Sequence, residues 1–411
     1  MQLPPGRFVC WQAHFEPTND AGLTVSTQTP FTSGWGSSPW TIDFRPRKSA
    51  LPARADIAIV GAGFTGLAAA AWLRHLDPTK SVVVLESETI GGGASGRTGG
   101  MILSETAAGD LRGLGDVLAG FQRSLSELKI DCAVAITGAW EIERSARKAE
   151  ERARTRGESP IDWQDSGTLR VTKDVPGGTI DPGMLVSGMA RAAETSGAII
   201  CENSPAAALV WPGEKEPEKE IEIAVAGAGQ PLRCQQLLLA TNAMNLEVAG
   251  LAEDTEPKFT MAIATEPLSE AQLEAIGLAG RQPFYTMDFP YLWGRVTRTN
   301  AVVFGGGLVH VEDWRDLSEI NVATGEASRL LDSLEARVHK LHPALHGVAI
   351  THRWGGPILF AESMKPIFQR HRASRNALVL AGYAGHGVAL SVYLGCWAAE
   401  VLLGRRQLPQ W

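Results

Sequence analysis

Cysteine is scarce in this chain, and its placement excludes the disulfide-rich classes of protein. The five cysteines, in a chain of 411 residues, are Cys10, Cys132, Cys201, Cys234 and Cys396. They are odd in number, stand far apart and form no CxxC pair, whereas a disulfide framework or a zinc knuckle needs clustered thiols. We therefore expect reduced thiols and a cytoplasmic location.

The chain also lacks an excess of positive charge. It carries 38 Lys and Arg against 45 Asp and Glu, a formal net charge of −7. No overall basic field is present to hold a nucleic acid or an anionic membrane surface. We therefore expect no nucleic-acid partner.

Long uninterrupted hydrophobic runs are missing as well. The first residues lack the apolar core of a signal peptide. The most apolar stretch, 377–404, contains one acidic residue, Glu400, and one histidine, His386, but glycines interrupt it. This pattern favours a buried strand, a turn and a helix, and we expect no membrane span.

Glycine is abundant by contrast, and its clearest cluster follows an apolar strand. Residues 57–60 are continuously apolar, and Gly61, Gly63 and Gly66 come next, at the start of an Ala-rich helical stretch. A second apolar run, 81–85, ends at Glu86. A strand, glycine turn, helix, strand and acid in this order predict a dinucleotide-binding unit, with the pyrophosphate at the helix N-terminus and the carboxylate on a ribose.

A second glycine cluster, 91–100, distinguishes a flavin from a nicotinamide dinucleotide. The long arm of a flavin must pass several more residues of unobstructed backbone, whereas a nicotinamide cofactor needs no such loop. Arg97 in this loop can place positive charge near the phosphates or the ring. Gly227 and Gly229 lack a third glycine and a following helix, so we read them as a hairpin turn and find no separate NAD(P) site.

The remaining pattern mixes helices and short strands. Residues 1–54 predict an N-terminal extension, either wrapped onto the body through Trp11, Trp35 and Trp40 or mobile. Helical spacing is expected over 111–156, 181–197 (capped by Asp181, with Pro182 first), 317–341 and 388–403. Strands are expected over 167–171, 261–265, within 291–307 and over 377–381, and a β-meander over 198–242 with a charged turn at 214–220.

Five segments together resemble the FAD-dependent glycine/D-amino-acid oxidase (DAO) superfamily, and most closely its γ-glutamylputrescine oxidase-like amine oxidoreductases. They are ADIAIVGAGFTGLAAA (55–70), GGASGRTGG (92–100), DPGMLVSGMARAAETSGAII (181–200), LLLATNA with ATEPL (237–243 and 264–268), and GYAGHGVALSVYLG (382–395). The resemblance implies an α/β fold with a discontinuous FAD-binding Rossmann-like domain (55–110, 176–250 and 352–411) and an antiparallel-sheet substrate domain (111–175 and 251–351).

The resemblance also implies which residues bind the cofactor. By match these are Gly61, Gly63, Phe64, Thr65, Gly66, Glu86, Ser95, Arg97, Thr98, Gly99, Gly100, Gly385, His386, Gly387 and Val388. The chain departs from the pattern at Thr98, Ser363 and Gln369, where Asn, Asp and Gly are usual, and these departures leave the substrate open. The glycine loop 91–100 contains no His, and no Cys near the turn 385–388 is suited to covalent attachment of the flavin. We therefore expect FAD to bind noncovalently.

The activity that the resemblance implies is oxidation of the C–N bond of an amine or amino acid, by hydride transfer to the flavin. Oxygen or another acceptor then takes the electrons. Arg295 stands where the amino-acid oxidases carry an Arg for the substrate carboxylate, and Tyr291 lies nearby. His386 would touch the flavin edge. A surface Arg, a plain aromatic core cluster and a turn histidine are the competing interpretations of these three residues.

Three alternatives stay open at this stage. The enzyme is either an oxidase or a dehydrogenase that uses a non-oxygen acceptor, or the chain is a flavin-binding subunit without amine turnover. His339, His342 and His346 suggest a metal site, but Pro343 breaks the geometry between them, and we expect no metal. The oligomeric state is not indicated by the sequence.

Overall fold

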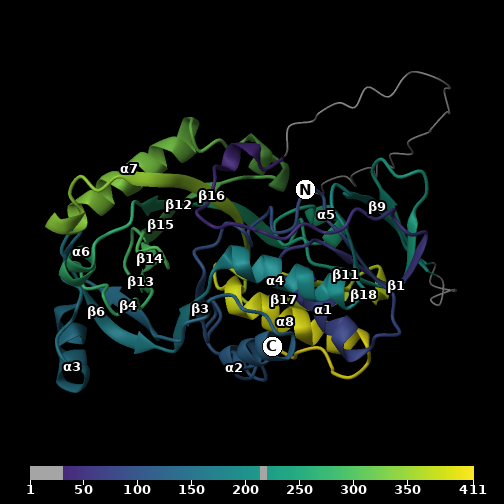
Figure 1. Ribbon diagram of the computed structural model, residues 1–411, viewed down its shortest axis with the longest axis horizontal. Helices are drawn as coiled ribbons and strands as arrows, with labels where there is room; N and C mark the ends of the chain where they lie inside the picture. The colour runs from purple at the N-terminus through teal and green to yellow at the C-terminus, as the bar shows by residue number, and fades with distance from the viewer. Residues whose placement is uncertain (1–30, 213–219) are drawn as a thin grey trace, which may run out of the picture. The chain divides into compact units, whose positions relative to one another are not determined.

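The structure, a computed structural model, describes residues 31–212 and 220–411, and two eight-stranded sheets dominate them (Figure 1). Cys10, Trp11 and most of the charged turn expected at 214–220 lie outside the described residues. Residues 31–411 form one unit with two large hydrophobic cores. One core contains residues of both sheets, and the other lies between the opposite face of one sheet and the helices that cover it.

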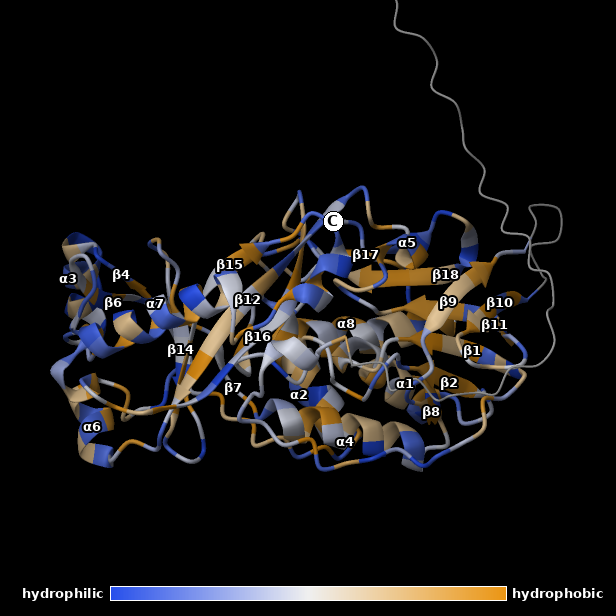
Figure 2. Cartoon of the chain, turned by 90° about the horizontal axis from the view of Figure 1, so that it is seen from above, coloured by the Kyte–Doolittle hydropathy of each residue, from blue (hydrophilic) through white to orange (hydrophobic). Residues whose placement is uncertain are grey.

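The first sheet is mainly parallel and carries the predicted strand–helix–strand unit. In sheet order its strands are β17 (Ile367–His371), β18 (Ser374–Ala381), β11 (Leu232–Leu239), β1 (Arg54–Val60), β2 (Val82–Leu85) and β8 (Ile199–Cys201), and β10 (Ile221–Val225) and β9 (Ala206–Val210) extend it beside β11. Ile59 pairs in parallel with Leu238 on one side and Val84 on the other. The central strands β1 and β2 are strongly hydrophobic and mostly buried because both faces of the sheet are covered there, whereas β9 at the edge is largely exposed (Figure 2).

Helices α1 (Phe64–Leu76), α4 (Pro182–Thr195) and α8 (Gly387–Leu402) pack together beside this sheet, and α2 (Val117–Glu127) packs against α8. The helix expected from Asp181 is confirmed, because the Asp181 side chain accepts the Met184 N–H and Pro182 occupies the first turn. Almost every residue of α8 is buried. Among the described helices, none is long and apolar enough to cross a membrane.

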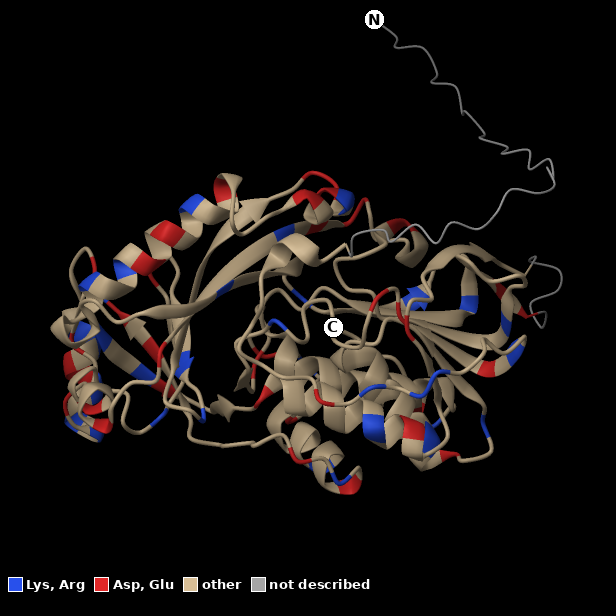
Figure 3. Ribbon diagram, turned by 45° about the horizontal axis from the view of Figure 1, so that its top comes forward, with Lys and Arg blue, Asp and Glu red and all other residues tan. Residues whose placement is uncertain are grey.

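The second sheet is almost entirely antiparallel. Its order is β16 (Ile350–Ala361), β12 (Thr255–Thr265), β15 (Val302–His310), β14 (Trp293–Val296), β13 (Phe284–Thr286), β4 (Ala139–Glu143), β6 (Thr168–Val175) and β5 (Trp163–Gln164). Helix α7 (Gly325–Leu341) packs on β12 and β15, and its outer face carries acidic and basic residues (Figure 3). Helix α3 (Ala146–Arg156) packs on β6.

Short elements join the two sheets. Strands β3 (Met101–Leu103) and β7 (Gly177–Thr179) form an antiparallel pair between them. The remaining short elements are α5 (Leu246–Ala249) and the 3₁₀ turn η1 (Ser33–Trp35), and, among the connections within the second sheet and α7, α6 (Glu270–Ala275), η2 (Trp314–Glu319) and η3 (Pro343–Leu345).

Two expected helices are shorter in the structure. Residues 139–143, inside the expected helix 111–156, form strand β4, because all five side chains are buried between β6 and β13. The expected helix 317–341 begins only at Gly325, and the preceding η2 turn is closed by a capping box between Asp313 and Asp316. The expected β-meander forms through the antiparallel strands β9, β10 and β11, but the preceding strand β8 pairs in parallel with β2.

The domain boundaries expected from the sequence stay a prediction, and two segments make contacts across them. Strand β16, placed in the cofactor part from residue 352 onward, pairs with β12 in the second sheet. Helix α2, placed in the substrate part, packs against α8 beside the first sheet. Both contacts join segments far apart in the chain, and the local sequence pattern carries no information about such contacts.

Candidate cofactor and active site

The turn between β1 and α1 tolerates glycine alone at its critical positions. Gly61 has φ +106°, and a Cβ there would lie 2.6 Å from the Ala240 carbonyl oxygen. A Cβ on Gly66 would lie 1.9 Å from the Gly61 oxygen, and one on Gly63 would lie 2.8 Å from Ser95 Oγ. The backbone is therefore packed tightly and leaves a side-chain-free cradle at the helix start, as a pyrophosphate site requires.

The N-terminus of α1 is capped by Gly63, without a side-chain hydrogen bond. The Phe64 N–H donates to Ser95 Oγ over 2.9 Å, so the second glycine loop touches the first. A helix N-terminus carries partial positive charge and free N–H donors, which favour a phosphate. Phe64 and Thr65 are both buried in this first turn.

Glu86 lies at the end of β2, beside this turn. Its Oε2 accepts the Ala62 N–H over 2.9 Å, and its Oε1 accepts the Glu88 N–H over 3.0 Å. Burial raises the pKa of the carboxyl group, while these backbone donors oppose that shift. Oε1 also accepts the Ser87 hydroxyl over 3.1 Å, whereas Oε2 keeps a second lone pair, which can accept a ribose hydroxyl.

Thr241 provides an independent test of whether a cofactor fits here. Its Oγ1 is buried and has no hydrogen-bond partner among the described residues. Its backbone N lies 3.4 Å from the Cβ position of Gly61. A buried hydroxyl without a partner is costly, and a polar ligand at the β1–α1 turn would satisfy it. The residue lies inside the LLLATNA segment, although the sequence did not single it out.

The second glycine loop is held against the second sheet. The Trp354 indole donates to the Arg97 carbonyl over 2.8 Å, and a Cβ on Gly99 would lie 2.1 Å from the Trp293 ring. The Arg97 guanidinium donates to the carbonyls of Gly92 and Gly36, over 3.2 and 2.6 Å. Arg97 therefore shapes the loop through backbone contacts, in addition to carrying charge. Burial lowers its pKa.

The start of α8 joins the start of α1. The Tyr383 hydroxyl lies 2.6 Å from Thr65 Oγ1, although the two residues are 318 positions apart. His386 caps α8 with its backbone, and its Nδ1 lies 3.3 Å from the Ala384 carbonyl oxygen. Burial lowers the pKa of His386, which favours the neutral imidazole. The other expected residues of this turn, Gly385, Gly387 and Val388, flank His386, and Gly385 has φ +89°.

Arg295 is buried beside the cofactor loop, with 3% of its surface exposed. One guanidinium nitrogen, Nη1, donates to the carbonyls of Gly100 and Ile180, and the group lies 5.1 Å from the centre of the Trp40 ring. Its Nε has no hydrogen-bond partner, and no described carboxylate forms a salt bridge with it. Burial lowers its pKa to about 10, so the group stays cationic at neutral pH.

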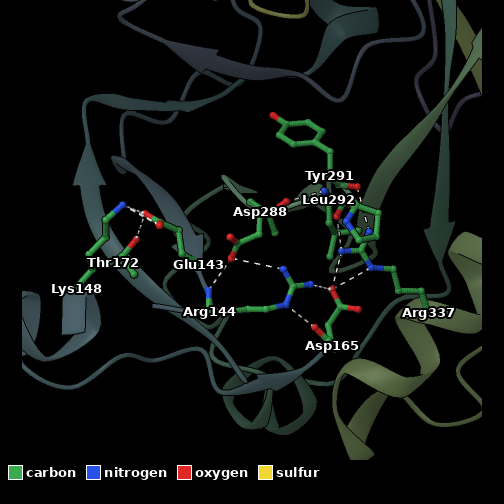
Figure 4. A network of polar contacts seen from close by, with 11 residues as sticks. Glu143, Arg144, Lys148, Asp165, Thr172, Asp288, Tyr291, Leu292 and Arg337 are labelled. Atoms are coloured by element: carbon green, nitrogen blue, oxygen red, sulfur yellow. Dashed lines mark hydrogen bonds and ion pairs between the residues drawn. The ribbon is translucent and has the colours of Figure 1, made fainter. Parts of the chain in front are cut away.

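Tyr291 lies apart from Arg295, in the loop between β13 and β14. It is 40% exposed, and its side chain points away from the polar contacts beneath it (Figure 4). Its carbonyl accepts the Arg337 Nη1 over 3.1 Å. No contact joins Tyr291 to Arg295 or to His386 among the described residues, so its catalytic role stays a prediction.

Asp165 is the centre of the network that holds this loop (Figure 4). Its Oδ2 accepts from Arg144 over 3.0 Å and from Arg337 over 2.6 Å, and its side chain is only 9% exposed. Arg337 also donates to the Pro290 carbonyl, and the Arg144 N–H donates to Asp288. No motif marks these residues, because they meet only in the folded chain.

Asp165→Asn is expected to destabilise the protein by about 3 kcal/mol, because two largely buried guanidinium groups lose their shared carboxylate. Chemical denaturation monitored by tryptophan fluorescence measures the change. Asp162→Asn is the matched control: Asp162 is 62% exposed and pairs with Arg170 over 3.4 Å, so a loss below about 0.5 kcal/mol is expected. Equal losses for both variants would contradict the assigned role of Asp165.

Tyr285 places a second polar cluster beside β3. Its hydroxyl lies 3.3 Å from Glu105 and 3.2 Å from Glu141, and Lys173 donates to Glu141 over 2.9 Å. The two carboxylates and burial raise the pKa of Tyr285, so the phenol keeps its proton. Tyr285 also packs near Trp293.

Two of the three histidines considered for a metal site, His339 at the end of α7 and His342 after it, have structural partners. His339 Nε2 lies 2.9 Å from the Val348 carbonyl, and His342 Nδ1 accepts the Ala344 N–H. Within residues 31–212 and 220–411, no group of three His, Cys, Asp or Glu side chains is arranged to hold a metal ion.

The fold and the cradle define a dinucleotide-binding flavoprotein with a parallel nucleotide sheet and a second, antiparallel sheet. The family model of FAD dependent oxidoreductases (DAO) matches residues 56–401, and the chain belongs to this family. FAD is therefore its cofactor, and the expected fold class and enzyme class are confirmed.

Two curated relatives cover most of the chain. Gamma-glutamylputrescine oxidoreductase of Escherichia coli (strain K12) is 27% identical over 384 residues, which cover 85% of this chain and 84% of the relative. A probable oxidoreductase, OrdL, of Rhizobium meliloti (strain 1021) is 24% identical and covers 93% of this chain and 91% of its own length.

Solved structures share the fold at low identity. Glycine oxidase from Geobacillus kaustophilus superposes with a TM-score of 0.66 at 18% identity, covering 87% of this chain and 96% of that one. L-proline dehydrogenase from P. horikoshii gives 0.67 at 18% identity with the same coverage.

Proposed function

We propose that this enzyme oxidises the C–N bond of an amine or amino acid whose carboxylate binds Arg295. The observation that carries this proposal is the buried Arg295 beside Gly100, a cation with no salt-bridge partner among the described residues. The Asp181 carboxylate partly opposes the lowering of the Arg295 pKa without forming a salt bridge, and an anionic substrate group in direct contact would compensate more of the cost of the buried charge. The curated relative that acts on gamma-glutamylputrescine supports an amine substrate.

Bound FAD supplies the acceptor for the hydride of the carbon beside nitrogen. The residues of the chain hold and orient the substrate. Arg295 offers its free Nε to a carboxylate oxygen, and the Trp293 ring packs against Gly99 of the loop. A neutral His386 adds no like charge that would repel a protonated amine.

The noncovalent state of FAD and a cytoplasmic location belong to the same proposal. The cysteines within the described residues, Cys132, Cys201, Cys234 and Cys396, are buried free thiols. Burial raises the pKa of Cys396 to about 12, which disfavours the thiolate needed for attachment to a flavin. Release of the flavin by acid or heat denaturation would support noncovalent binding.

The first experiment is an anaerobic absorption spectrum of the purified yellow protein, recorded during additions from a panel of amines and amino acids. Bleaching of the flavin bands by a carboxylate-bearing amine is the expected result. Readmission of air then separates an oxidase, whose bands return, from a dehydrogenase, whose bands stay bleached until another acceptor is added. If no amine bleaches the flavin, the chain is instead a flavin-binding subunit without amine turnover.

A further inference from the structure

Residues 31–47 lie outside the segment that matches the family model, 56–401, and we name them the strap. At one end the strap is fixed to the second sheet and to the η2 turn. The Trp35 indole donates to the Leu317 carbonyl in η2, and Gly36 forms a β-bridge with Trp354 of β16. At the other end the Asp43 N–H donates to Ser187 Oγ of α4. The strap therefore crosses from one sheet to the helices of the other.

Between these anchors the strap contacts the cofactor loop at successive positions. Ser38 Oγ donates to the Gly96 carbonyl over 2.8 Å, and the Trp40 indole donates to the Thr98 carbonyl over 2.8 Å. Ile42 fills the space over two loop glycines, because a Cβ on Gly91 would lie 3.0 Å and one on Gly96 3.1 Å from its Cδ1.

The strap also reaches the acidic end of β2. The Thr32 N–H and hydroxyl donate to the Glu88 carboxylate over 3.3 and 2.7 Å. The Glu88 N–H in turn donates to Glu86 Oε1, the carboxylate expected to bind the ribose. The strap thus contacts both segments that surround the expected cofactor site after β2.

A loop rich in glycine loses much conformational entropy when it becomes ordered. If nothing else fixed the loop, the binding of FAD would have to supply that free energy, and affinity would fall. The contacts of Ser38, Trp40 and Ile42, together with the hydrogen bond from Trp354 to Arg97, fix the loop without using the cofactor.

We propose that the strap is part of the cofactor site and that Trp40 is a positioning residue, which preorganises the loop 91–100 for FAD. Trp40 has two separate contacts: its indole N–H holds Thr98, and its ring faces the Arg295 guanidinium. The hydrogen bond determines FAD affinity, and the ring orients Arg295. The part that concerns FAD affinity is independent of which amine the enzyme oxidises, whereas the role of the ring rests on the proposed carboxylate contact of Arg295.

The test compares Trp40→Phe, Ser38→Ala and the double variant with the wild-type protein. Flavin is removed, and the dissociation constant of FAD is measured by fluorescence quenching, together with the melting temperature of the flavin-free protein. Each single variant is expected to weaken FAD binding roughly tenfold and the double variant roughly 10- to 100-fold, with the flavin-free melting temperature unchanged.

Trp411→Phe is the matched control, because its indole also donates to a backbone carbonyl, that of Pro366, away from the loop. FAD affinity within twofold of wild type is expected for this control. Trp40→Leu removes the ring as well and is expected to raise KM for a carboxylate-bearing substrate beyond the effect of Trp40→Phe.

Unchanged FAD affinity in Trp40→Phe and Ser38→Ala would overturn the proposal, whatever happens to the melting temperature. If Trp40→Phe does not fold, Ser38→Ala alone decides, because it removes a single hydroxyl contact. A wild-type protein that binds FAD but oxidises no amine would refute the proposed function and leave this test intact.

Discussion

Gly66→Ala is expected to abolish the retention of FAD. The added Cβ would lie 1.9 Å from the Gly61 carbonyl oxygen and 3.1 Å from Ile59 Cγ2, so α1 must move away from β1. That shift displaces the helix N-terminus that faces the pyrophosphate. We expect FAD affinity to fall at least about 100-fold, or ~3 kcal/mol, with a lower melting temperature as well. Absorbance at the flavin bands after gel filtration measures the retained cofactor.

Gly229→Ala is the control for this substitution. Gly229 is exposed in a turn outside both glycine clusters, and a Cβ there meets no atom within 4 Å. Its flavin content and melting temperature are expected to match those of the wild type. A Gly66→Ala protein that purifies with a full complement of FAD would show that the β1–α1 turn is not the pyrophosphate site.

Arg295→Met is expected to lower kcat/KM for amino-acid substrates about 100- to 1000-fold, because a buried cation that pairs with the substrate carboxylate contributes roughly 3–4 kcal/mol. Amines without a carboxylate are expected to lose less than tenfold. Arg295→Lys keeps the charge but loses the planar fork, so an intermediate loss is expected. Steady-state kinetics with matched substrate pairs, with and without a carboxylate, provide the measurement.

Flavin content separates the two roles that Arg295 can have. Its Nη1 also holds the carbonyls of Gly100 and Ile180, so a purely structural role would lower FAD retention and reduce activity on all substrates equally. That outcome would contradict the proposed carboxylate contact. Arg298→Met, three residues further along and exposed, is the control, and less than a twofold change is expected.

The dinucleotide cradle could be predicted from the sequence because its information is local. The apolar strand, Gly61, Gly63 and Gly66, and the acid Glu86 lie within one short segment, and each residue type has a backbone or charge requirement that its neighbours reveal. The cap of α4 by Asp181 is local in the same way.

The error at β4 has the opposite cause. Residues 139–143 contain too few residues for a helical and an extended pattern to be separated, and pairing with β6 and β13 decides the conformation. Strand β16 pairs with β12, and helix α2 packs against α8. Both contacts likewise join segments that lie far apart in the sequence.

The sequence by itself therefore determined the cofactor class, the β1–α1–β2 unit and the glycine positions, since a tight turn restricts residue choice directly. Only the tertiary structure decided that Tyr383 meets Thr65, that Asp165 joins Arg144 to Arg337, and that the strap covers the cofactor loop. These contacts join residues dozens to hundreds of positions apart. Hydrogen bonds of ordinary side chains leave no periodic or spaced signal in the chain, so they become visible only when folding brings the partners together.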